Sequence, residues 1–282
     1  MTETNSHSKL KTNKDLMDIS RKMRGEIVEM SHTADAMHLG SSLSCVDIFV
    51  ALYYGGCLNI DPKNASLPTR DRVLLSKGHA SMTLYKILAE KGFFPKSLLK
   101  TFNKSGSHLT EHPNLGALPG VEMTAGSLGH GLSVGLGMAL AGRIRSVPYN
   151  VFVIMSDGEC NEGSVWEAAM LAPAQKADNL VAIIDFNRWQ ATGRSEKIMA
   201  LNPLKEKWES FGWSAYDIDG HDIGSLIKIL SAVPDGSGKP MAIIAHTIKG
   251  KGVSFMEDDN NWHYRIPNAE EVKKAKGELK VP

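Results

Sequence analysis

Short runs of apolar residues alternate along this chain with longer segments in which apolar residues recur every three or four positions. A short continuous apolar run is typical of a strand buried in a parallel sheet, and the longer spacing is typical of an amphipathic helix. The runs predict strands at residues 73–76, 151–155, 180–186, 213–218 and 241–247. Because helical segments separate these strands, the pattern predicts an α/β fold with a parallel sheet flanked by helices.

The first helical pattern runs from Leu16 to Met30. Further helices are expected at residues 45–56, 81–92, 97–103, 131–144, 162–176, 203–211, 223–233 and 269–280. The small-residue segment 36–44 is expected to be a loop whose Ser44 caps the next helix, and 249–252 a flexible basic loop. No Pro- or Gly-rich linker divides the chain, so we expect a flexible arm at residues 1–12 and one domain at 13–282.

Composition narrows the class of protein. The chain has 282 residues, 42% of them hydrophobic, which is enough for a sizeable core. A formal net charge of +1, with scattered Lys and Arg, argues against a nucleic-acid or membrane-surface role. No apolar stretch is long enough for a transmembrane helix, and the polar N-terminus does not resemble a signal peptide. Three cysteines without metal-ligand spacing indicate reduced thiols in a cytoplasmic protein.

The segment 151–187 carries the strongest chemical signal. Two expected strands with a helix between them form a βαβ crossover, and ligands of open parallel sheets bind at the carboxyl edge. Asp157 and Asn187 each follow one of these strands, so we expect their oxygens to point into one crevice. Gly158 permits a sharp turn or a close approach. The helix N-terminus near Glu162 offers free N–H groups to an anion.

A carboxylate and an amide oxygen at this spacing suit a hard cation such as Mg²⁺, which keeps open positions for phosphate oxygens. Taken alone, either residue is more typical of a helix cap or the end of a strand. It is the pair, about thirty residues apart along the crossover, that favours a combined metal and anion site.

Other candidates lie in loops and turns. His79 follows the strand at 73–76 in the same way that Asp157 follows the strand at 151–155. His38 and His112 lie in loops, where a single histidine is usually solvated or structural. Residues 126–131 resemble a backbone cradle, although glycine-rich turns are common. The Gly- and Ala-rich helix that follows indicates close packing, either within the core or at a subunit interface.

Together these segments resemble transketolases over residues 15–265. The stretch from Ser156-Asp157-Gly158 to Asn187 resembles the thiamine diphosphate motif of that family. Five further motifs follow the family's order: His38-Leu39-Gly40, the segment from Thr69 to Ala80, Glu111-His112-Pro113, the loop from Pro119 to Gly129, and Lys249-Gly250-Lys251-Gly252 with Trp262-His263.

The resemblance implies a set of roles. Asp157, Asn187 and the backbone carbonyl of Trp189 would hold Mg²⁺ or Ca²⁺. Thiamine diphosphate would contact a set made of His79, Gly126, Ser127, Leu128, Gly158, Glu162, Asn187 and His263. His38, His79, His112 and His263 would be catalytic, because imidazole exchanges protons near neutral pH. The reaction would transfer a two-carbon ketol unit from a ketose phosphate to an aldose phosphate.

Some positions depart from the family pattern. Ser156 replaces a glycine, His130 a glutamine, and Thr192 an aspartate, and Arg188 stands where a small residue is common. Arg188 could meet a phosphate. These departures do not affect the assignment to the family, but they bear on which sugars are used.

Members of the family are about twice as long as this chain. The resemblance therefore implies the N-terminal subunit of a split transketolase, inactive alone, whose C-terminal partner carries the pyrimidine-binding domain; a heterotetramer with two copies of each subunit is expected. Alternatives are half of another thiamine-dependent enzyme, similar to 1-deoxyxylulose-5-phosphate synthase or a 2-oxo-acid dehydrogenase, or a non-catalytic, cofactor-binding regulatory subunit.

Overall fold

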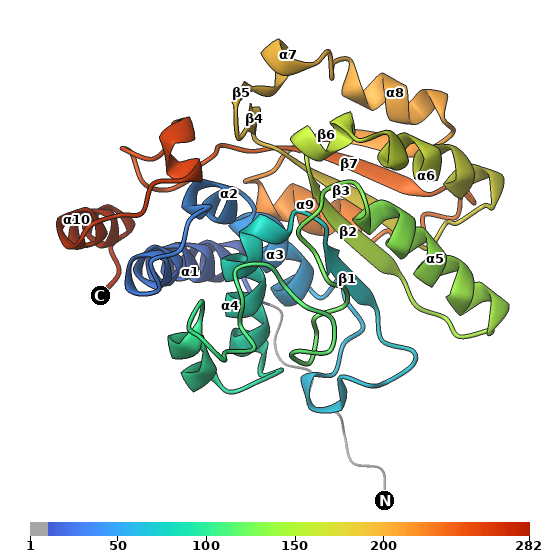
Figure 1. Cartoon of the computed structure of the whole chain (residues 1–282). Coiled ribbons are helices and arrows are strands. Elements are labelled where there is room, and N and C mark those ends of the chain that lie inside the picture. The colour runs from blue at the N-terminus through green and yellow to red at the C-terminus, as the bar shows by residue number, and fades with distance from the viewer. Residues whose placement is uncertain (1–10) are drawn as a thin grey trace, which may run out of the picture.

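A parallel five-stranded sheet forms the centre of the computed structural model, which describes residues 11–282 (Figure 1). The strand order is β1-β2-β3-β7-β6, with β1 at Arg72–Leu75, β2 at Val151–Ser156, β3 at Leu180–Phe186, β7 at Met241–His246 and β6 at Ser214–Asp219. All pairs are parallel, and Ser156 pairs with Asp185 in the register of β2 and β3. The α/β prediction is confirmed, and each predicted strand agrees with an observed strand to within about one residue.

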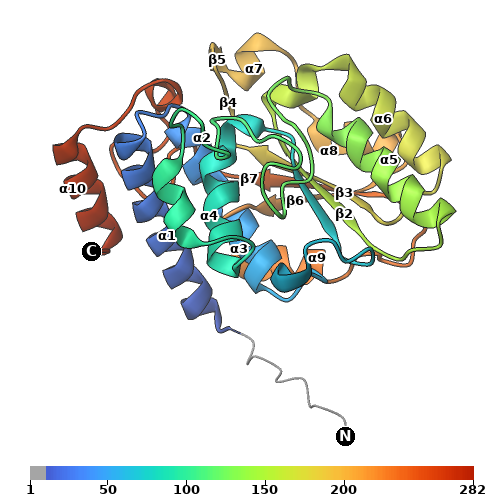
Figure 2. The same ribbon diagram turned by 60° about the horizontal axis from the view of Figure 1, so that its bottom comes forward.

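Helices cover both faces of this sheet (Figures 1 and 2). One layer contains α1 (Asn13–Thr33), α3 (Val46–Tyr54), α4 (Ser81–Lys91), α9 (Ile223–Leu230) and α10 (Ala269–Leu279). The other contains α5 (Gly131–Ile144), α6 (Gly163–Ala174) and α8 (Leu204–Ser210). Alternate strand residues face the two layers: Phe152 and Ile154 join the first core, and Val153 and Met155 the second. The strands are buried on both faces, which explains their continuous apolar runs.

A capping box fixes the first residue of helix α1. Thr12 accepts a hydrogen bond from the Asp15 N–H, and the Asp15 carboxylate accepts one from the Thr12 N–H, so α1 begins with a capping box. Most of the expected arm, residues 1–10, lies outside the described residues. Within residues 11–282, no helix has both the length and the apolar character that crossing a bilayer requires.

One expected loop is a helix. Residues Leu39–Ser44 form α2, all of them buried, so the prediction of a loop at 36–44 is wrong. Ser44 does not cap α3; its hydroxyl donates to the Ser41 carbonyl and the Asp185 carboxylate. The helix forms because distant groups satisfy its carbonyls: Lys77 donates to Ser41 O (3.0 Å), and Thr83 to Ser42 O (2.7 Å).

Several smaller elements connect the strands and helices. Short 3-10 turns occupy Gly78–Ala80, Gly158–Asn161 and Asn260–His263, and the expected helix at 97–103 is a 3-10 segment, Lys96–Thr101; a further turn is Pro62–Asn64. A hairpin of β4 (Trp189–Gln190) and β5 (Gly193–Arg194), followed by α7 (Ser195–Ile198), was not predicted. It follows Asn187 directly and projects beyond the main sheet (Figure 1).

Candidate functional site

Asp157 and Asn187 leave the carboxyl ends of adjacent strands, β2 and β3, and both are buried. The Asp157 carboxylate accepts hydrogen bonds from the Ser195 hydroxyl (2.7 Å) and the Gly158 N–H (2.9 Å). Asn187 Oδ1 accepts from the Trp189 N–H (3.0 Å). Burial raises the pKa of Asp157 to about 6. The expected oxygens therefore lie at one edge of the sheet.

The Asp157 and Asn187 oxygens suit a cation whose remaining ligands come from phosphate and water. Among residues 11–282 no group of three or more His, Cys, Asp or Glu could enclose a metal ion. One carboxylate and one amide oxygen are instead what Mg²⁺ uses when phosphate oxygens and water complete its coordination. The Trp189 carbonyl stays a predicted third ligand.

The histidines predicted to be catalytic form one cluster. His38 is central: its ring centroid lies 4.9 Å from that of His263, 5.5 Å from that of His79 and 5.9 Å from that of His112. They come from the start of α2, the turn after β1, the loop before Pro113 and the last 3-10 turn. His38 has a left-handed backbone (φ 66°), and its N–H donates to the His263 carbonyl (2.8 Å). Separate parts of the chain thus meet at one point.

This environment favours neutral imidazoles. Burial and the nearby Lys249 ammonium lower the pKa of His263 to about 3. Burial, with Lys77 nearby, also holds the pKa of His79 well below its usual range. Burial lowers the pKa of His38, although Glu111, 3.0 Å from His38 Nδ1, opposes the shift. Neutral rings keep a nitrogen lone pair that can accept a hydrogen bond from a substrate hydroxyl.

The loop before α5 is fixed by hydrogen bonds at its C-terminal end and is exposed at its N-terminal end. The Gly129 N–H donates to the Glu159 carboxylate (2.9 Å), and the Gly131 N–H to the Ser76 hydroxyl (3.0 Å). Ser76 in turn donates to Glu159. Gly129 has φ +85°, and a Cβ there would lie 2.6 Å from Glu162 Cβ, so only glycine fits. Gly126 and Ser127 are exposed and Leu128 is half-buried, and their contact with a ligand stays a prediction.

Two further predicted residues lie beside this loop. Glu162 is exposed and occupies the N-cap of α6, although its side chain makes no capping hydrogen bond. Gly158 begins the turn after β2, and a Cβ there would lie 2.9 Å from Gln190 Cγ. Its role in the structure is therefore to admit the hairpin. Both residues flank the N-terminus of α6, where free N–H groups lie.

The four positions that depart from the family pattern differ in burial. Ser156 is buried, and its hydroxyl accepts from the Glu159 N–H (3.2 Å). His130 and Thr192 are exposed. Arg188 is exposed in a left-handed conformation, with φ +67°.

Two buried lysines were missed by sequence reasoning. Lys77 pairs with Asp185, and both side chains are fully buried. Lys249 lies in the segment predicted to be a flexible basic loop, and it is also fully buried. Its ammonium lies 2.7 Å from Asn260 Oδ1 and 3.1 Å from His263 Nδ1, and no carboxylate among the described residues pairs with it. Burial and Lys77 lower the pKa of Lys249 to about 7. No local sequence signal distinguishes these lysines from surface ones.

Comparisons with known proteins show which family this chain is similar to. Residues 13–281 match the family described as "Transketolase, thiamine diphosphate binding domain". The chain is 41% identical over 260 residues to a subunit of the apulose-4-phosphate transketolase of Phocaeicola vulgatus, covering 92% of each chain. It is 42% identical over 242 residues to the 6-deoxy-6-sulfo-D-fructose transketolase subunit SqwG of a Clostridium species, covering 86% of this chain and 88% of that one.

A solved structure shows the same fold. The transketolase of Campylobacter jejuni superposes with a TM-score of 0.90 at 31% identity, covering 96% of this chain but 43% of that one. The chain thus spans less than half the length of this solved relative, whereas it matches the two subunits along nearly their whole length. The family prediction made from the motifs is confirmed. The chain belongs to the transketolase family and contains its thiamine diphosphate binding domain.

Proposed function

We propose that this chain is the N-terminal subunit of a split transketolase, which transfers a two-carbon ketol unit from a ketose phosphate to an aldose phosphate. The observation that carries the proposal is the cluster of His38, His79, His112 and His263 at the same sheet edge as Asp157 and Asn187. Proton-exchanging groups beside a metal and anion site suit sugar chemistry at a phosphorylated cofactor.

The residues present fit thiamine diphosphate. Lys249 holds a buried ammonium that faces only neutral acceptors, and a diphosphate would supply the missing counter-charge. The N-terminus of α6 adds a positive dipole end. Gly126, Ser127 and Leu128 leave room for the cofactor, with Gly158 and Glu162 beside them. When bound, thiamine diphosphate supplies the nucleophilic carbon that attacks a sugar carbonyl.

The protein's own groups would position this cofactor and move protons. Asp157, Asn187 and the Trp189 carbonyl would hold Mg²⁺, or Ca²⁺, against the diphosphate. His79 and His263 would face the cofactor, and His38 and His112 the sugar hydroxyls. Glu111 would orient the His38 ring through the Nδ1 contact, leaving the other ring nitrogen for substrate.

A second chain would complete the site. The Campylobacter jejuni transketolase is more than twice as long as the matched region, and the apulose-4-phosphate and 6-deoxy-6-sulfo-D-fructose relatives of similar length are named as subunits. We propose a C-terminal partner that supplies the pyrimidine-binding domain, assembled as two copies of each subunit. The outer face of α5 is a docking candidate: Val134 and Ile144 are exposed there, beside exposed Met170 and Leu171 of α6. The free thiols of Cys45, Cys57 and Cys160 agree with a cytoplasmic location.

The sugar named differs between relatives of this chain. The two relatives named as subunits are described as acting on different sugars, apulose-4-phosphate and 6-deoxy-6-sulfo-D-fructose. An assay of the reconstituted pair against phosphorylated and sulfonated ketoses identifies the donor. Decarboxylation of a 2-oxo acid in place of ketol transfer would overturn the proposal in favour of another thiamine-dependent class.

Calorimetry tests the cofactor site directly. The reconstituted pair is titrated with thiamine diphosphate and Mg²⁺, and Asp157→Ala is compared with Asp178→Ala, a change at a half-buried carboxylate near the opposite edge of the sheet. Removing a charged ligand should weaken metal-dependent binding at least about tenfold, since Mg²⁺ demands near-ideal geometry. Equal affinities in the two variants would refute the metal assignment.

A further inference from the structure

The hairpin after Asn187 has little stability of its own. Each strand contains two residues, Trp189–Gln190 and Gly193–Arg194, and isolated two-stranded hairpins are marginal in water. The following residues, 196–200, are exposed. The hairpin must therefore be held by contacts with other parts of the chain.

One set of contacts leads to the proposed metal ligands. Ser195 donates from its hydroxyl to Asp157, and the Trp189 N–H donates to Asn187 Oδ1. A bound metal ion would compete for these same oxygen atoms. If these were the only bonds to the hairpin, metal binding would remove its support.

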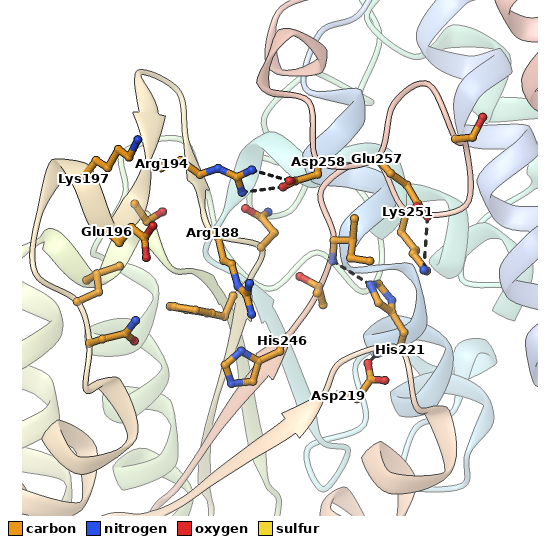
Figure 3. Close-up of a pocket in the computed structure, with 18 residues that line it drawn as sticks. Arg188, Arg194, Glu196, Lys197, Asp219, His221, His246, Lys251, Glu257 and Asp258 are labelled. Carbon is orange, nitrogen blue, oxygen red and sulfur yellow. Dashed lines mark hydrogen bonds and ion pairs between the residues drawn. The ribbon is translucent and has the colours of Figure 1, made fainter.

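A second set of contacts does not involve those oxygens. The Asp258 carboxylate accepts hydrogen bonds from both terminal nitrogens of Arg194, at 2.7 and 2.5 Å (Figure 3). It also accepts one from the Trp189 indole N–H at 2.8 Å. The Arg194 guanidinium lies over the Trp189 ring, 3.9 Å from its centroid. One carboxylate thus holds both strands of the hairpin.

Asp258 is itself anchored to the other half of the site. Its N–H donates to the Lys249 carbonyl (2.8 Å), and its backbone is left-handed, with φ +59°. Asn260, which accepts from the Lys249 ammonium, donates to the Ala191 carbonyl at the hairpin tip (3.0 Å). The segment bearing the proposed diphosphate cation and the hairpin bearing the proposed metal ligand are therefore one connected unit.

We propose that Asp258 is a positioning residue that, through Arg194 and Trp189, holds the hairpin in place for metal binding before the cofactor arrives. The inference rests on the proposed metal site and adds a residue to it. Binding to a hairpin already in place avoids the conformational entropy that ordering its backbone would cost. Neutralising Asp258 should shift that cost onto metal binding.

The test compares Asp258→Asn with Glu196→Gln in the full chain reconstituted with its partner subunit. Glu196 is an exposed carboxylate next to the hairpin and makes no hydrogen bond or ion pair within residues 11–282. Amide hydrogen exchange of a peptide covering residues 188–195 is measured without metal or cofactor. Mn²⁺ affinity is then measured by electron paramagnetic resonance at a fixed thiamine diphosphate concentration.

We expect faster exchange and about fivefold to tenfold weaker Mn²⁺ binding in Asp258→Asn, with an unchanged melting temperature and Glu196→Gln behaving as wild type. Arg194→Lys keeps the charge but not the two-pronged contact, so its exchange rate and Mn²⁺ affinity should lie between those of the other two variants. It replaces Asp258→Asn in the test if that variant does not fold. Wild-type exchange rates in Asp258→Asn, or unchanged Mn²⁺ affinity, would overturn the inference alone. Absence of Mn²⁺ binding by the wild-type chain reconstituted with its partner would instead overturn the proposed metal site.

Discussion

Replacing Lys249 by methionine should stabilise the cofactor-free chain while weakening its function. The ammonium is fully buried and faces Asn260 and His263 without a carboxylate partner among the described residues. Its pKa falls from 10.5 to about 7. Since one pKa unit corresponds to about 1.4 kcal/mol, keeping this group in the folded chain at pH 7 costs about 4–5 kcal/mol. Methionine removes that cost but loses hydrogen bonds that contribute about 1 kcal/mol each.

The net expectation is a chain more stable by on the order of 3 kcal/mol at pH 7. The pH dependence of this stability difference follows from the protons bound by the folded and unfolded chains. Because the folded pKa lies below the unfolded pKa, the unfolded chain binds more protons between pH 7 and 10.5, and wild-type stability rises across that window. The advantage of Lys249→Met should therefore be full below pH 7 and vanish near pH 10.5.

Urea unfolding of the full chain at pH 7 and pH 10 measures this difference. Lys251→Met is the matched control, because Lys251 is half-buried and lies 3.4 Å from the Glu257 carboxylate. The control should change stability by less than about 1 kcal/mol. Thiamine diphosphate affinity of Lys249→Met should fall about 10- to 100-fold, the loss of one charge-assisted hydrogen bond. A Lys249→Met chain less stable than wild type at pH 7, or with undiminished cofactor affinity, would refute the reasoning.

Three further predictions concern other parts of the chain. Asp47→Asn should cost about 3 kcal/mol in urea unfolding at pH 7, because it leaves the buried Arg24 without its 2.6 Å partner. Although burial opposes it, Arg24 keeps the pKa of Asp47 well below 3.8, so this contribution is present above about pH 4 and disappears on acidification; a loss independent of pH would contradict it. His112→Ala should lower turnover about 100-fold or more with little change in melting temperature, and a large drop in melting temperature with normal activity would show a structural role. Gly131→Ala drives a Cβ into the Ser76 side chain and should destabilise the chain by about 1–3 kcal/mol, whereas Gly137→Ala, on the same helix with open space, should stabilise it by up to about 1 kcal/mol; equal melting temperatures would contradict the packing account.

The parts predicted well from sequence depend on local or short-range patterns. A continuous apolar run such as 180–186 is typical of a strand buried on both faces, and it is one. The position of Asp157 directly after such a run places it at the carboxyl edge. Gly131, Gly135 and Gly142 face Ser76, Val153 and Tyr149, whereas Gly137 faces open space. Helix α5 therefore packs against the core through three of its glycines, which is one of the two expected alternatives, and a subunit interface on its open face stays a prediction.

The parts that were missed depend on contacts between distant residues. Helix α2 contains Gly40 and three serines, which have low helix propensity, and forms because Lys77, Thr83 and the Gly250 N–H satisfy its carbonyls. The same holds for Lys249, which resembles any loop lysine in sequence. The hairpin at 189–194 is too short to produce a periodic signal, and Asp258, 64 residues beyond Arg194, fixes it.

Ketol transfer by the chain alone and with its partner subunit tests the central claim most directly. Purified chain is supplied with thiamine diphosphate, Mg²⁺, a ketose phosphate and an aldose phosphate, and aldose formation is measured before and after adding a C-terminal subunit. The account predicts no turnover by the chain alone and restored turnover at equimolar partner, abolished again by Asp157→Ala. Full turnover by the chain alone, or none with any partner while cofactor is bound, would contradict it.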